Sequence, residues 1–346
     1  MISLSTLSRR PFSATFQRLV AIYRQNAALF IGITALIQVP SLILRYVLGL
    51  PLLAAQSDPA YESLMSGATV PDASQVEHLL NLIVLPTLGL IVVTLVTILI
   101  EVVLVDAPIT YISAESEFGR QPTFAEALAA VRARMAVIVG GVITYGVLLI
   151  GLGFALLMAF VLTGAISQLL FFAFWGGLFV TVFVLTWPLL VPVLVLEQTA
   201  GVQAVRRSFE LTKVRLWPIL GLTAGLALIT NLVLPVIAGL FGTSPTGDAL
   251  TSIFTGIVGI LLGPVPTIGY TLFYLEARVR KEGLDKALEA IPNGRPIHVL
   301  PPPTSGPLIA SEDWINLGIV FVSIFILILL LMALGFGSAG IRAVGG

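Results

Sequence analysis

The chain has no cysteine, only two histidines, and charged residues that make up 10% of its 346 positions. Without cysteine, it can form no disulfide, no thiolate nucleophile and no thiolate-bound metal site. The histidines, His78 and His298, are not accompanied by a cluster of metal-binding residues. No nucleophile elbow, phosphate-binding loop or other catalytic motif is present. The sequence therefore predicts a protein that is not an enzyme and uses no cofactor or metal.

The scarcity of charge accompanies a large excess of apolar residues. Hydrophobic residues make up 57% of the chain, and the mean hydropathy is +1.04. Soluble domains typically contain about 25% charged residues. A soluble chain of this composition would expose apolar patches that aggregate. These values predict an integral membrane protein.

Seven apolar stretches are long enough to cross a bilayer, which takes about 20 residues of helix. They lie at about 28–54, 79–105, 135–163, 168–196, 216–241, 250–275 and 314–337. The expected fold class is therefore all-α, a polytopic transmembrane helical bundle. Within these limits only Arg45 and Glu101 carry a formal charge.

The connections between the spans differ in charge. Sixteen of the 18 basic residues fall on the N-terminal side of the membrane, and the exceptions are Arg45 and Arg342. Because cytoplasmic loops are enriched in Lys and Arg, this side is predicted to be cytoplasmic. The N-terminus is then inside and the C-terminus outside, in a multi-pass protein of the inner (plasma) membrane.

Proline divides the chain into a core and an appendage. Residues 291–313 are rich in proline, which favours extended backbone and predicts a linker. The domain organisation is then a six-span core over 1–290, the linker, and a C-terminal transmembrane helix with a short tail over 314–346. That last helix is a candidate for docking to a larger membrane complex.

Three segments that precede spans resemble one another. They are residues 15–32, 123–140 and 204–221. Arg24, Arg132 and Lys213 occupy the same aligned position. Each segment is predicted to form a short amphipathic helix, here called an elbow helix, and each is followed by two spans. The core is therefore predicted to contain three repeats of an elbow helix plus a helical hairpin. The alternative is that any cytoplasmic segment feeding a span tends to be basic and amphipathic.

Basic amphipathic helices can lie in the membrane interface, where their Arg and Lys side chains reach lipid phosphates. The elbows are therefore the candidate site for contact with lipid headgroups or a partner protein. The candidate residues are Arg24, Arg132, Arg134, Arg206, Arg207, Lys213 and Arg215.

A second candidate site comprises polar residues inside the spans, namely Arg45, Glu101 and Asn231. Ionisable groups within a membrane are costly and often functional. The alternative for Arg45 is that its side chain extends to the lipid headgroups, that is, it snorkels. Glu101 fits either a proton or cation site, or a clamp to an elbow arginine like those expected for Glu197 and Glu276. Asn231 also fits a hydrogen bond between helices.

Four stretches carry a resemblance to a known family. They are residues 19–40 (LVAIYRQNAALFIGITALIQVP), 117–128, 192–222 and 274–290 (YLEARVRKEGLDKALEA). Together they resemble the glycerophosphoryl diester phosphodiesterase membrane-domain family over about 12–290. The resemblance implies the membrane half alone, because no soluble stretch is long enough for a catalytic barrel of roughly 250 residues. It also implies a bacterial inner membrane.

Two functions are consistent with these features. The first is a non-enzymatic scaffold or accessory subunit that engages anionic lipids or a membrane complex through its basic elbows. The alternative is a small transporter or lipid-handling protein with a polar site near the middle of the membrane. The basic residues lie next to spans rather than in a soluble module, so nucleic acid is not an expected partner.

Overall fold

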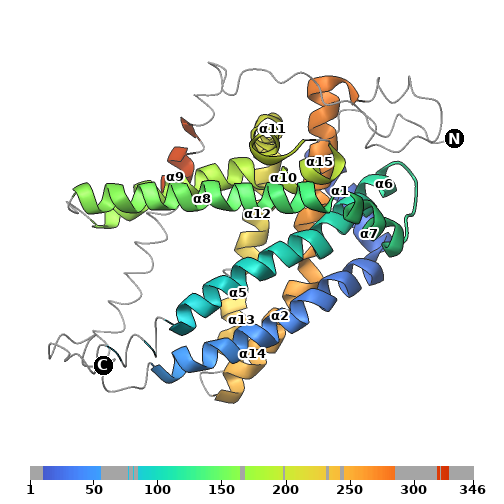
Figure 1. Cartoon of the computed structure of the whole chain (residues 1–346). Helices are drawn as coiled ribbons and strands as arrows, with labels where there is room; N and C mark the ends of the chain where they lie inside the picture. Colours follow the sequence, from blue (N-terminus) through green and yellow to red (C-terminus); the bar gives the residue numbers. More distant parts are fainter. Residues whose placement is uncertain are drawn as a thin grey trace.

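The computed structural model describes residues 11–55, 77, 81, 85–163, 168–197, 199–230, 234–241, 245–284, 318–319 and 321–326. All elements in this part of the chain are helices, which confirms the predicted all-α fold class (Figure 1). The predicted linker at 291–313 lies outside the described residues.

The first part of the fold is one elbow helix and one hairpin. Helix α1 (Phe12–Gln25) is followed by the long helix α2 (Ala27–Ala55). The chain returns through α5 (Leu85–Glu101), which packs along α2. A π-helical turn, η3 (Val102–Asp106), then leads into α6 (Ala107–Glu117).

The second part has the same order of elements. Helix α7 (Phe124–Ala133) begins with a capping box in which Thr123 and Glu126 bond to each other's backbone N–H groups. Helix α8 (Met135–Thr163) follows, and α9 (Gln168–Thr186) returns beside it. After a break, α10 (Leu190–Leu196) completes the return.

The third part is the most interrupted. The elbow helix α11 (Gly201–Val214) is followed by α12 (Leu216–Leu228), and the two are bent by 94°. Helix α13 (Leu234–Phe241) continues the predicted fifth span. Helices α14 (Pro245–Leu262) and α15 (Pro264–Glu282) form the return. Helices α12 and α13 lie within the predicted fifth span, 216–241, and residues 231–233 between them lie outside the described residues.

The residue between each elbow helix and the next helix has the same backbone geometry. Asn26 has φ -119° and ψ 18°, and Arg134 has φ -117° and ψ 9°. Arg215 has φ -125° and ψ 30°. All three occupy one aligned position in the predicted repeat, two residues beyond the aligned base. The repeat remains a prediction, and this common geometry is consistent with it.

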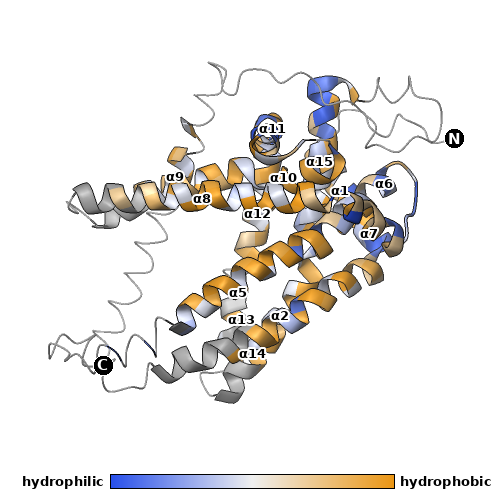
Figure 2. Ribbon diagram, viewed as in Figure 1, coloured by the Kyte–Doolittle hydropathy of each residue, from blue (hydrophilic) through white to orange (hydrophobic). Residues whose placement is uncertain are grey.

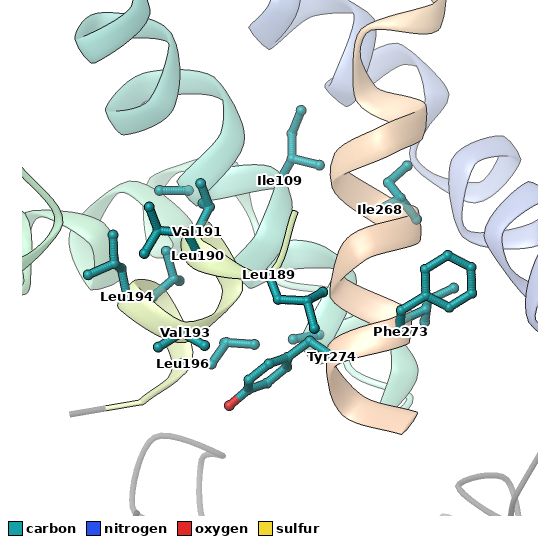
Figure 3. Close-up of a cluster of buried hydrophobic side chains, with 14 of the residues drawn as sticks. Ile109, Leu189, Leu190, Val191, Val193, Leu194, Leu196, Ile268, Phe273 and Tyr274 are labelled. Atoms are coloured by element: carbon teal, nitrogen blue, oxygen red, sulfur yellow. The ribbon is translucent and has the colours of Figure 1, made fainter. Parts of the chain in front are cut away.

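The hairpins spread outward from a common hub of helices, where α15 packs against α1, α6 and α11, and α10 packs against α6 and α8 (Figure 1). The hub core is formed by large apolar side chains from segments far apart in sequence. Ile109 of α6, Leu189 and Leu194 around α10, and Ile268 of α15 are fully buried there, beside Tyr274 (Figure 3). Dense packing of such side chains gains dispersion energy at many atom contacts.

Hydropathy divides the molecule into two regions. The hairpins are apolar along their length, whereas polar residues gather at α11, at the end of α15 and around α6 and α7 (Figure 2). Many apolar side chains on the hairpins are exposed, such as Leu36, Val92, Val147 and Ile253. Water would penalise this surface, and acyl chains would not.

Five described helical segments are long and apolar enough to cross a membrane, or six if the bent pair α11 and α12 is one span. They are consistent with a multi-pass membrane protein. Of the predicted seventh span, only residues 318–319 and 321–326 are described. Phe321 lies 5.2 Å from Phe174 of α9, measured between ring centroids, so this segment contacts the core.

Candidate functional site

All three returning helices are interrupted before they reach the hub. The interruptions are the π-helical turn at Val102–Asp106, the break at Trp187–Leu189 and the turn at Gly263. Each contains or is closely followed by a proline, which lacks a backbone N–H and disfavours a continuous helix. These prolines are Pro108, Pro188 and Pro264. Residues from all three interruptions line one cavity.

The volume of this junction cavity is about 370 Å³. Its polar side chains are Glu101, Asp106, Thr267 and Tyr270, from α5, η3 and α15. The remaining wall is formed by Phe183, Trp187, Pro188, Val191, Pro192, Gly263 and Pro266. Two carboxylates thus share an otherwise largely apolar cavity at the level of the helix breaks.

The hydrogen bonds of the cavity hold the acidic groups in place. Gln38 Nε2 of α2 donates to Glu101 Oε1 over 3.2 Å, and Thr267 Oγ1 donates to Asp106 Oδ1 over 2.7 Å. The Tyr270 hydroxyl lies 2.9 Å from Thr223 Oγ1. None of the described residues that line the cavity is Lys or Arg. The cavity therefore presents negative or acceptor oxygens without a basic partner in its wall, which suits a positively charged ligand.

The structure places the predicted intramembrane residues differently from one another. Glu101 lines the junction cavity and contacts Gln38, rather than an elbow arginine. Arg45 is on helix α2, and its side chain lies outside the described part of the structure. Asn231 lies outside the described residues as well. Thr230, its neighbour, is exposed and donates back to Leu226 O, so it does not line this cavity.

Sequence reasoning missed the other polar residues of the cavity. Asp106 is one residue beyond the predicted end of the second span. Thr267 and Tyr270 follow two prolines within the sixth span. An acid just before a proline in an apolar run was the available signal for Asp106, because a helix break exposes polar groups inside the membrane.

A second polar cluster lies in the hub and joins the end of α10 to α11 and α15. Glu197 and Arg207 form a buried pair, with 2.9 Å from Arg207 Nε to Glu197 Oε2. Arg207 also pairs with Glu282, and Arg278 Nε donates to Glu282 over 2.9 Å. The Tyr274 hydroxyl donates to Glu197 over 2.9 Å. The two acids and two bases balance in charge, which reduces the cost of burying them.

Burial alone would lower the pKa of the Arg207 guanidinium. The hydrogen bonds and charges of Glu197 and Glu282 outweigh that effect and raise the pKa above its ordinary value. Because the pKa of arginine is already far above neutrality, Arg207 remains a cation and holds both acids.

A neighbouring cluster around Glu276 joins α1 and the junction of α11 and α12 to α15. Arg215 lies 2.8 Å from Glu276, measured between Nη2 and Oε2, and both side chains are buried. Thr15 Oγ1 of α1 donates to the same carboxylate over 3.3 Å. The predicted clamp between a span-ending acid and an elbow base is therefore confirmed for Glu197 and Glu276, and not for Glu101. The outer pairs of the hub are Arg18–Glu117, Arg120–Glu115, Arg206–Glu210, Lys281–Glu210 and Arg280–Glu276.

The Arg134 side chain forms hydrogen bonds with backbone carbonyl groups. Its Nη1 donates to Val195 O over 2.9 Å and to Glu197 O over 2.8 Å, and so satisfies carbonyls at the end of α10. Burial lowers the pKa of this guanidinium. The contact ties the junction of α7 and α8 to the same acid-bearing turn that Arg207 holds.

The predicted headgroup contacts therefore divide into three groups by exposure. Arg207 and Arg215 are buried in ion pairs, and they are not available to reach lipid phosphates. Arg24 and Arg132 are exposed at the ends of α1 and α7. Arg134 and Arg206 are half-buried, and so is Lys213, whose ammonium lies 4.9 Å from the ring centroid of Phe209.

Comparisons with protein families, with curated proteins and with solved structures found no match.

Proposed function

We propose that this protein is a small, non-enzymatic transporter-type membrane protein that binds a cationic ligand in the junction cavity. The observation that carries the proposal is the pair Glu101 and Asp106 in one cavity of about 370 Å³, lined by residues from the irregular turns of three returning helices. Irregular backbone within membrane helices is tolerated where it lines a cavity, and transporters commonly build ligand sites at such irregular turns. A small metal cation or an amine fits this chemistry.

Trp187 lines the same cavity and provides the experiment with its reporter. The purified chain in detergent is titrated with sodium, ammonium and ethylamine chlorides, and with sodium acetate at matched sodium concentration. We expect a saturable change in tryptophan fluorescence with at least one cation and no added effect of acetate. The change should be lost in Trp187→Phe. It should need about tenfold more cation in Glu101→Gln/Asp106→Asn. A wild-type response in the double variant, or no saturable response to any cation, would contradict the proposal.

Membrane placement is part of the same proposal. The chain is assigned to an inner (plasma) membrane with the hub and the N-terminus on the cytoplasmic side and the C-terminus outside. Support comes from the basic residues of α11 and the end of α15, because Lys and Arg concentrate on the cytoplasmic face. A reporter that is active only outside the cytoplasm should be active when it is fused to the C-terminus. An inactive reporter on an intact fusion protein would contradict this orientation.

A second candidate function is the scaffold or accessory role, in which exposed elbows engage anionic lipids or a membrane complex. Exposed Arg24 and Arg132 stand at the ends of two elbow helices that also expose Phe16 and Leu128. A cation beside exposed apolar side chains is the pattern of a helix lying in the interface. Pull-down of the full chain from gently solubilised membranes should enrich anionic lipid or a partner. Recovery of the bare monomer would argue against this role.

A further inference from the structure

An apolar groove separates helix α1 from helix α12 and the start of α15. Its volume is about 440 Å³. Phe12, Phe16 and Val20 form the α1 wall, and all three are exposed. Ile22, on the adjoining side of α1, is buried in the hub core, and the buried Leu19 lies between it and the groove, which it also lines. Helix α1 therefore has an exposed apolar strip beside its buried side, and no described residue covers this strip fully.

Two glycines of α12, Gly221 and Gly225, form the floor of this groove. A Cβ atom added at Gly225 would meet nothing within 4 Å, and one at Gly221 would meet only Phe12 Cζ at 4.0 Å. The groove thus exists because these two positions lack side chains. A larger residue at Gly225 would occupy it without striking the backbone.

A basic side chain stands at one end of the groove wall. Phe12, Phe16, Val20 and Arg24 follow one another at intervals of four residues, so they form one stripe along α1. Arg24 is exposed in the last turn of that helix. Tyr23 also lines the groove, but its hydroxyl already donates to Leu261 O over 2.8 Å. The groove therefore offers an apolar trough with a cation at its end.

We infer that this groove binds one anionic phospholipid, with an acyl chain against Gly221 and Gly225 and its phosphate at Arg24. The groove has a cation at one end and apolar side chains along its length, and a phospholipid likewise has a charged headgroup followed by an apolar acyl chain. Lipid also surrounds this face of a membrane protein. The inference deepens the second candidate function, on which it rests, and is independent of the ligand in the junction cavity.

The test is native mass spectrometry of the full chain in mild detergent, titrated with phosphatidylglycerol or phosphatidylcholine. Gly225→Leu fills the groove and should abolish the first phosphatidylglycerol bound. Ala224→Leu is the matched control, because Ala224 is exposed on the same turn but does not line the groove. Arg24→Gln should weaken phosphatidylglycerol binding about fivefold, as expected for one basic residue at a lipid surface. Arg132→Gln, at the aligned position of α7, should bind like the wild type.

Several outcomes would overturn the inference. Wild-type phosphatidylglycerol binding in Gly225→Leu would exclude the groove. Equal losses in Arg24→Gln and Arg132→Gln would show general attraction to basic elbows, which keeps the lipid-engaging role but removes this site. Loss of a dimer rather than of lipid in Gly225→Leu would assign the glycines to helix pairing. If Gly225→Leu does not fold, the comparison of Arg24→Gln with Arg132→Gln still decides.

Discussion

The carboxylate of Glu197 lies 2.9 Å from Nε of Arg207, and 7% or less of either side chain is exposed. The two are ten positions apart in sequence, across the turn from α10 to α11. The pair connects a returning helix to the next elbow helix, at the place where Tyr274 and Arg278 of α15 also converge. The orientation of the third elbow therefore depends on a charge pair inside the hub.

Breaking this pair should strongly destabilise the protein. Glu197→Gln leaves Arg207 buried with less compensating charge, and the free energy of unfolding should fall by about 3–5 kcal/mol. Denaturant unfolding in detergent, followed by tryptophan fluorescence, measures the change. Arg206→Gln is the control, because the Arg206–Glu210 pair is partly exposed and its loss should cost less than about 1 kcal/mol. Equal effects of the two variants would show that the buried pair does not hold the hub.

Arg134 should matter through its backbone contacts rather than through the membrane surface. Arg134→Gln removes two charge-assisted hydrogen bonds to Val195 O and Glu197 O, and should lower stability by about 1.5–3 kcal/mol. The exposed neighbour Arg132, changed to Gln, should leave unfolding unchanged. Thermal unfolding of both variants in one detergent checks this prediction, which fails if their transitions coincide.

Two glycines should respond oppositely to the same substitution. A methyl group at Gly269 of α15 would overlap the side chain of Leu222 and lie 3.1 Å from Leu19 Cδ1, so Gly269→Ala should cost about 1–3 kcal/mol. At Gly146 of α8 an added Cβ meets nothing within 4 Å. Gly146→Ala should be neutral or slightly stabilising, because alanine favours helix. A tolerated Gly269→Ala would show that α1, α12 and α15 do not pack closely at this crossing.

The long helices could be predicted from the sequence because an uninterrupted apolar run leaves few alternatives. The predicted spans 28–54 and 135–163 differ from α2 (Ala27–Ala55) and α8 (Met135–Thr163) by one residue or less at each end. A predicted span whose helix has a break was less accurate. The predicted span at 168–196 is α9 and α10 with a break at Pro188.

The polar sites were only partly predictable, since they depend on contacts between distant residues. The clamps of Glu197 and Glu276 followed from their positions at span ends, facing basic elbows. The burial of Arg207 did not, because it requires Glu282 from α15, which lies 75 residues further along the chain. The cavity partner of Asp106, Thr267, is 161 residues away. Hydropathy locates such residues in the membrane but does not say which of them meet.

Cysteine accessibility tests the junction cavity most directly, because the natural chain has no cysteine. Thr267→Cys lines the cavity, whereas Thr271→Cys, one turn along α15, is fully buried and serves as the control. Both variants are treated with cationic 2-aminoethyl methanethiosulfonate and with the anionic 2-sulfonatoethyl reagent. A cation-binding cavity predicts that Thr267→Cys reacts faster with the cationic reagent, that Glu101→Gln/Asp106→Asn removes this preference, and that Thr271→Cys stays unreactive. No reaction at Thr267→Cys, or equal rates with both reagents, would contradict it.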